Sequence, residues 1–146
     1  MGDALTDADL RRLVALHKEQ KALATLALAW VRDTSRYRVA ELDAGHNVLS
    51  FQEKPEPGEE ISELANAGIY VLEPGALDYV PENTFSDFAR NVFPILLGAG
   101  KKVVGYEVGG CYWSDIGTLE AYKEAQCDAL SGKVWVCIPG ERRGNL

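Results

Sequence analysis

The amino-acid sequence predicts an α/β fold, built as a mixed sheet with helices on both faces. Segments with helical apolar spacing alternate with strand-like apolar runs, which is typical of α/β proteins. A hairpin signal interrupts the crossovers, because residues 39–42 and 48–51 flank a short polar loop that contains Gly45. An antiparallel hairpin among crossover units indicates a sheet with both parallel and antiparallel pairs.

In the first half of the chain, a helix is expected to run to about residue 20, with Thr6 or Asp7 as its N-cap. Residues 24–31 are apolar on both faces, which predicts a central strand covered by helices. The proline-rich stretch 55–60 predicts a polar loop. Residues 67–72 predict another buried strand.

In the second half, apolar residues repeat helically from Ser86, and Pro94 predicts a kink or restart of that helix. Residues 102–108 predict a strand, and Thr118 is expected to cap a last helix through about residue 130. Residues 133–138 predict a further strand. Gly2 and Asp3 stand where a strand should just have finished, so the chain is expected to be a segment of a longer protein.

Composition and charge exclude several classes of protein. Apolar residues make up 47% and charged residues 25% of the 146 residues, as in an ordinary globular domain. A net charge of −7 argues against nucleic-acid binding through a basic face. The sequence has no apolar run of about 18 residues and no signal-peptide pattern, which argues against a membrane protein. Three cysteines without a CxxC pair argue against a disulfide framework or zinc site and favour a reduced, cytoplasmic compartment.

Two polar segments are candidates for ligand binding. In Phe51–Pro55, Glu53 and Lys54 stand at a predicted strand end, where the carboxylate could accept sugar hydroxyls and the ammonium could neutralise a phosphate. The alternative is a solvated, salt-bridging strand end. Asn66 begins a buried strand, and Gly68 would let a ligand approach the backbone.

Several aspartates are candidate metal ligands. Asp3 lies outside the first predicted helix, and Asp115 stands just before a helix cap. Two such aspartates from distant parts of the chain could share one Mg²⁺ bound to phosphate oxygens. For Asp115 the alternative is a tight strand-to-helix turn. Asp7 and Asp9 have the DxD form of metal-dependent glycosyltransferases, but in the first turn of a helix they would simply favour its dipole.

Five segments taken together are more specific than any one alone: Gly2–Asp3, Phe51–Pro55, Asn66–Tyr70, Phe93–Pro94 and Trp113–Thr118. In this order they resemble the sugar-1-phosphate nucleotidyltransferases, also called nucleotide-sugar pyrophosphorylases. The likeness is greatest to mannose-1-phosphate guanylyltransferases that carry a C-terminal left-handed β-helix. The resemblance implies the Rossmann-like fold of nucleotide-diphospho-sugar transferases, incomplete here. Residues 1–132 would be the C-terminal, sugar-binding part of the nucleotidyltransferase domain, and 133–146 the start of a linker to the β-helix.

The resemblance also implies a function in nucleotide-sugar biosynthesis. In this family a sugar phosphate oxygen attacks the α-phosphorus of a nucleoside triphosphate and pyrophosphate leaves, so catalysis is positioning and charge neutralisation. GTP and mannose 1-phosphate are the favoured substrates, and Mg²⁺ is the implied cofactor. The implied roles are catalysis for Lys54 and Asp115, Mg²⁺ binding for Asp3 and Asp115, and substrate binding for Glu53, Lys54, Asn66 and Gly68.

The sequence departs from the family pattern in two ways. It has no glycine-rich segment near GxGTRxxP to cradle the triphosphate, so the chain alone is expected to be weak or inactive. Arg38 stands where the family commonly has glycine, and would narrow the pocket or add a phosphate contact. An open sheet edge is expected to favour a homo-oligomer. The alternatives are a non-catalytic nucleotide-sugar-binding or regulatory module and a DxD glycosyltransferase.

Overall fold

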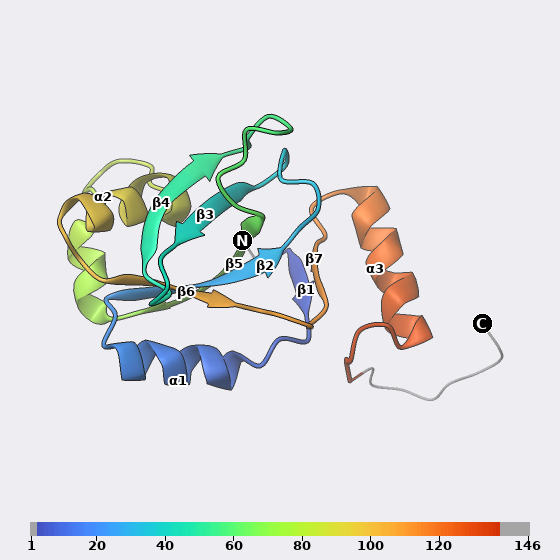
Figure 1. The fold of residues 1–146 in the computed structure, drawn as a ribbon. Helices are drawn as coiled ribbons and strands as arrows, with labels where there is room; N and C mark the ends of the chain where they lie inside the picture. The colour runs from blue at the N-terminus through green and yellow to red at the C-terminus, as the bar shows by residue number, and fades with distance from the viewer. Residues whose placement is uncertain (1–2, 138–146) are drawn as a thin grey trace. The chain divides into compact units, whose positions relative to one another are not determined.

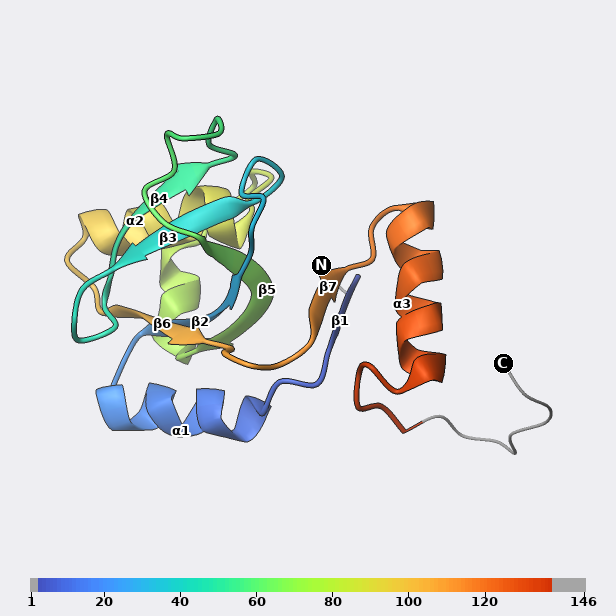
Figure 2. The same cartoon turned by 45° about the vertical axis from the view of Figure 1, so that its right-hand side comes forward.

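The computed structural model describes residues 3–137, which form two compact units. One unit is Asp9–Gly109, and the other combines residues 3–8 with residues 110–137. Figures 1 and 2 show the helices and strands of each unit in two views. Among the described residues, no helix has both the length and the apolar character needed to span a bilayer.

The larger unit contains a five-stranded mixed sheet in the order β4-β3-β5-β2-β6. Strand β2 (Ala24–Trp30) lies inside the sheet, antiparallel to β5 (Leu64–Leu72) and parallel to β6 (Val103–Glu107). Strands β3 (Arg38–Leu42) and β4 (Val48–Glu53) form an antiparallel hairpin. The predicted mixed sheet, hairpin and internal strand are therefore confirmed.

Helices cover both faces of this sheet (Figures 1 and 2). Successive residues of β2 point to opposite faces. Thr25 faces helix α1 (Leu10–Gln20), where its hydroxyl lies 2.8 Å from Nδ1 of the buried His17. Leu26 faces the main apolar core, which also contains residues of the 3₁₀ helix η1 (Pro74–Tyr79).

The core on that second face is closed by a π-helical turn, η2 (Phe88–Val92), that leads directly into helix α2 (Phe93–Gly98). In η2 the Phe93 N–H donates to the Phe88 carbonyl, five residues earlier. The next partner in that register, for the Ala89 carbonyl, would be Pro94, which has no N–H. The helical segment therefore restarts near Pro94, as predicted, although it begins at Phe88 and not at Ser86.

The smaller unit pairs two short strands that the sequence did not predict. Strand β1 (Ala4–Thr6) is antiparallel to β7 (Trp113–Asp115), and helix α3 (Leu119–Ser131) follows. The Thr118 hydroxyl accepts the Ala121 N–H at 3.2 Å, which confirms the predicted cap of α3.

Two local predictions are wrong. Helix α1 is capped by Asp9, whose Oδ1 accepts the Arg11 N–H, because Thr6 belongs to β1. Residues 133–137 form no strand, since the Lys133 N–H closes the end of α3 and the Trp135 N–H donates to Asp7. Residue 138 of that predicted strand lies outside the described residues.

Candidate functional site

The pairing of β1 with β7 brings Asp3 and Asp115 together. Asp3 precedes β1, where a strand end was expected, and its carbonyl accepts the Ile116 N–H at 2.7 Å. Both carboxylates face Gly117, because a Cβ added there would lie 3.0 Å from Oδ1 of Asp115 and 3.5 Å from Oδ2 of Asp3. Asp115 Oδ1 also accepts the Gly117 N–H at 2.9 Å. Two aspartates that are distant in sequence thus flank one glycine.

This arrangement fits Mg²⁺ in its donor chemistry. Mg²⁺ prefers oxygen ligands and is usually held by one or two carboxylates together with waters and substrate phosphates. Gly117 leaves open the space that a Cβ would fill between Asp3 and Asp115. Residues 3–137 contain no group of three or more His, Cys, Asp or Glu side chains suited to a metal. A cation held here would take its remaining ligands from water or phosphate.

The DxD pair has other partners. Asp9 caps α1, and the two carboxylate oxygens of Asp7 accept the N–H groups of Tyr112 and Trp135 at 2.7 and 3.1 Å. The expectation that both residues lie in the first turn of a helix is therefore wrong. Because each carboxylate satisfies backbone N–H groups, the geometry gives no support to a glycosyltransferase metal site at this pair.

Lys54 follows β4 in an unusual backbone conformation. Its φ is 41°, in the left-handed region that residues other than glycine seldom adopt. Its N–H donates to the Tyr37 carbonyl at 2.9 Å, which fixes the backbone beside β3, and the residue is exposed. Strain of this kind is concentrated at functional sites.

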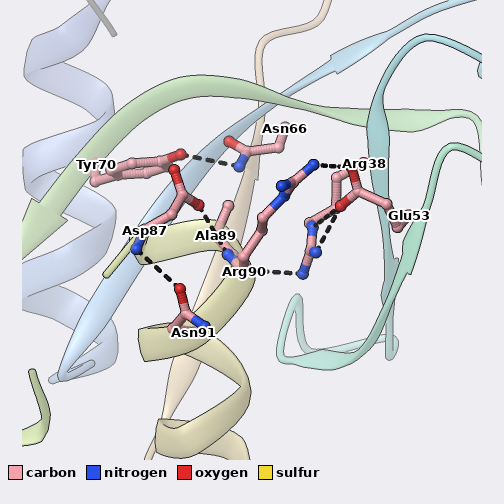
Figure 3. Close-up of polar contacts among 8 residues, drawn as sticks. All are labelled: Arg38, Glu53, Asn66, Tyr70, Asp87, Ala89, Arg90 and Asn91. Carbon is pink, nitrogen blue, oxygen red and sulfur yellow. Dashed lines mark hydrogen bonds and ion pairs between the residues drawn. The ribbon is translucent and has the colours of Figure 1, made fainter. Parts of the chain in front are cut away.

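Glu53 is held by two arginines (Figure 3). Nε and Nη2 of Arg38 donate to Oε2 of Glu53 at 2.8 and 2.5 Å, and Nη2 of Arg90 donates to Oε1 at 3.3 Å. Nη1 of Arg38 donates at 2.6 Å to the Ala89 carbonyl, the acceptor whose helical partner would have been Pro94. Arg38 thus pairs with the carboxylate expected to bind sugar hydroxyls.

The two arginines keep Glu53 ionised. Partial burial raises the pKa of the Glu53 carboxyl, but the hydrogen bonds and positive charges of Arg38 and then Arg90 outweigh that effect. The net result is a pKa below the usual value for glutamate.

Acidification is expected to weaken the fold through this ion pair. Because the folded-state pKa of Glu53 is depressed, the pair stabilises fully above the ordinary glutamate pKa of about 4.3 and loses its effect as pH falls through the folded value. Glu53→Gln should therefore lose less free energy of unfolding than the original chain between about pH 5 and pH 3. Urea unfolding at a series of pH values measures this. Glu19→Gln, an exposed change on α1, should lose as much free energy of unfolding as the original chain over this pH range. An equally large loss in Glu53→Gln would contradict the assignment of the pH dependence to Glu53.

Asn66 and Gly68 form a bulge in β5. Leu26 pairs with Tyr70 and Leu28 with Asn66, so β5 carries extra residues between these pairs. Gly68 has φ 78°, a conformation that glycine adopts without steric cost, and its N–H donates to Asn66 Oδ1 at 3.0 Å. Asn66 Nδ2 donates to the Tyr70 hydroxyl at 2.9 Å, and burial raises the pKa of that hydroxyl.

The segment around η2 supplies residues that the sequence analysis missed. Asp87 caps η2 by accepting the Arg90 N–H at 2.8 Å, and Asn91 Oδ1 accepts the Asp87 N–H at 2.9 Å. Figure 3 shows these side chains gathered with those of β3, β4 and β5. The available signal was Asp87 itself, a favourable N-cap before an apolar helical repeat. Glu53, Lys54, Asn66 and Gly68 all belong to this larger unit.

Comparisons with known proteins match nearly the whole chain. The family profile described as Nucleotidyl transferase matches residues 1–132. A UTP–glucose-1-phosphate uridylyltransferase from Synechocystis is 38% identical over 143 residues, and a mannose-1-phosphate guanylyltransferase from Mycobacterium tuberculosis is 37% identical over 134 residues. These matches cover 95% and 90% of this chain but only 36% of the length of each relative. A Bacillus anthracis structure described as a glucose-1-phosphate thymidylyltransferase superposes with a TM-score of 0.70 and 26% identity, over 94% of this chain and 55% of that chain.

Proposed function

We propose that this chain, which belongs to the Nucleotidyl transferase family over residues 1–132, binds the sugar phosphate in an enzyme that transfers a nucleotidyl group to a sugar 1-phosphate. The relatives are named as transferases acting on glucose 1-phosphate or mannose 1-phosphate, which supports this class of substrate. The observation that carries the proposal is Lys54. A cation on a strained, hydrogen-bonded backbone directly after Glu53 suits the recognition of a phosphate beside a sugar.

The proposed reaction requires little acid–base chemistry. An anionic oxygen of the sugar 1-phosphate forms a bond to the α-phosphorus of the nucleoside triphosphate, and the bond from that phosphorus to the departing pyrophosphate oxygen breaks. Lys54 would neutralise part of the sugar phosphate charge and so reduce repulsion between the reacting anions. Asn66 and Gly68 would line the sugar, and Glu53 would accept a hydroxyl with whatever acceptor capacity its arginines leave.

Asp3 and Asp115 are the residues that would hold Mg²⁺. When bound, the cation supplies neutralising charge to phosphate oxygens. The contribution of the chain itself is the pairing of β1 with β7, which keeps both carboxylates against Gly117.

The specific substrates in our proposal are mannose 1-phosphate and GTP. Similarity to the M. tuberculosis guanylyltransferase supports this pair, and similarity to the Synechocystis uridylyltransferase defines the competing one. Thermal unfolding with mannose 1-phosphate, glucose 1-phosphate, GDP-mannose and UDP-glucose separates them. We expect larger increases in Tm with the mannosyl compounds; larger increases with the glucosyl compounds would assign the competing pair.

Lys54→Ala is expected to abolish binding of the sugar 1-phosphate. A ligand at 100 times its Kd stabilises a folded protein by about 2.7 kcal/mol, so the original chain should show a clear increase in Tm with mannose 1-phosphate. The variant should show none, because its main phosphate-binding charge is gone. Lys18→Ala removes an equal charge from the exposed face of α1 and should keep the increase. An equal increase in Tm for Lys54→Ala and the original chain would refute the role of Lys54.

A further inference from the structure

The carboxylate of Glu53 has little hydrogen-bonding capacity left. An ionised carboxylate offers about four acceptor sites. Two N–H groups of Arg38 occupy Oε2, and one N–H group of Arg90 occupies Oε1. About one site remains by this count, so Glu53 cannot accept two neighbouring sugar hydroxyls unless an arginine moves.

Arg38 is held more firmly than Arg90. Its side chain is 15% exposed, whereas that of Arg90 is 63% exposed. Arg38 also satisfies the Ala89 carbonyl, which Pro94 cannot serve, so moving Arg38 would break bonds to two partners. Arg90 can turn into solvent at little cost, because exposed ion pairs contribute little. Arg38 is therefore the side chain that limits access to Glu53.

Two nearby charged residues, Asp87 and Lys54, do not take the place of Arg38 beside the Glu53 carboxylate. Asp87 accepts the backbone N–H of Arg90, and Lys54, the residue after Glu53, is exposed. Within residues 3–137, Arg38 and Arg90 donate hydrogen bonds to the Glu53 side chain. Removal of Arg38 would thus free both positions on Oε2 at once.

We propose that Arg38 is a specificity-determining residue of the sugar site, because it withholds Glu53 from the sugar hydroxyls. The inference rests on the proposed function. With Arg38 present, Lys54 holds the phosphate of the ligand, and Glu53 adds little to the binding of the sugar ring. Without Arg38, Glu53 accepts the ring hydroxyls and the site discriminates a hexose 1-phosphate from bare phosphate.

The test compares the Kd values of mannose 1-phosphate and inorganic phosphate by calorimetry. Arg38→Gly is expected to bind mannose 1-phosphate at least about tenfold more tightly, the effect of one hydrogen bond to a charged group, with no gain for inorganic phosphate. The gain must depend on Glu53, so Glu53→Gln should weaken mannose 1-phosphate binding by a larger factor in the Arg38→Gly background than in the original chain. Equal factors in the two backgrounds would overturn the inference.

Two further variants keep the test decisive. Arg38→Gln retains an amide that can serve the Ala89 carbonyl and should show the same gain if Arg38→Gly does not fold. Arg36→Gly removes an equal charge from an exposed position two residues before Arg38 and should leave both Kd values unchanged. Binding that is lost in Lys54→Ala but unchanged in both Arg38 variants would overturn this inference alone. No binding of either ligand by any variant would overturn the proposed function, and this inference with it.

Discussion

Replacing Phe93 with alanine is expected to lower the free energy of unfolding by about 3–5 kcal/mol, the usual cost of removing a buried aromatic ring. Phe93 is fully buried at the start of α2. Its ring stacks on that of Phe51, meets that of Tyr70 edge-on and is tilted against that of Phe88. The distances between ring centroids are 6.2, 4.9 and 5.8 Å, in that order. The loss is a large part of the 5–15 kcal/mol by which a domain is usually stable.

Urea unfolding of the chain measures this effect. Ile95→Ala, on the same helix but at a residue that is 41% exposed, is the matched control and should cost less than about 1 kcal/mol. Similar losses for Phe93→Ala and Ile95→Ala would mean that the ring cluster is not the centre of the core. The result also bears on the site, because Tyr70 orients the Asn66 amide and rests against Phe93.

The parts of the fold that could be predicted from sequence are those with a strong local pattern. Apolar residues on both faces predict strand β2, and two strand patterns around Gly45 predict the β3–β4 hairpin. Strands β1 and β7 could not be found, because each has three residues and their pairing joins segments that are far apart in the sequence.

The close packing around a strand glycine could not be predicted from sequence either. A glycine inside a strand indicates weakened pairing, a bulge or a close approach, but not which group approaches it. In the structure, a Cβ at Gly105 would lie 2.6 Å from a methyl of Leu42 and 2.7 Å from a methyl of Leu28. These side chains come from β3 and β2, so the crowding at Gly105 arises from tertiary packing.

In the candidate site too, local patterns could be predicted from sequence, whereas tertiary contacts could not. The sequence identified Glu53 and Lys54 as a pair of opposite charges at a strand end, and β4 does end at Glu53. It could not identify the partners of Glu53, because Arg38 and Arg90 come from separate elements. Arg38 is also held by the π-helical turn, because its Nη1 donates to the Ala89 carbonyl, for which Pro94 has no N–H to offer.

The smaller unit supports a prediction about divalent cations. Gly117→Ala is expected to weaken binding of Mn²⁺, used as a probe for Mg²⁺, at least about tenfold, comparable to disturbing the surroundings of metal ligands in other sites. The new Cβ would crowd the Asp115 carboxylate at 3.0 Å and contact the Asp3 carboxylate at 3.5 Å, without changing the charge. Asp115→Asn should weaken binding further, because it removes a charged oxygen ligand.

Electron paramagnetic resonance of free Mn²⁺ during titration measures these affinities directly and needs no catalytic activity. Gly98→Ala adds a methyl group that would meet no atom within 4 Å outside its chain neighbours and its own helix backbone. Glu120→Gln removes one exposed negative charge close to Asp115 in sequence. Both controls should bind Mn²⁺ like the original chain. If Glu120→Gln weakens binding as much as Asp115→Asn, the cation responds to net charge alone and Asp3 and Asp115 are not its ligands. If Asp115→Asn is affected and Gly117→Ala is not, the carboxylates bind a cation without needing the space beside Gly117.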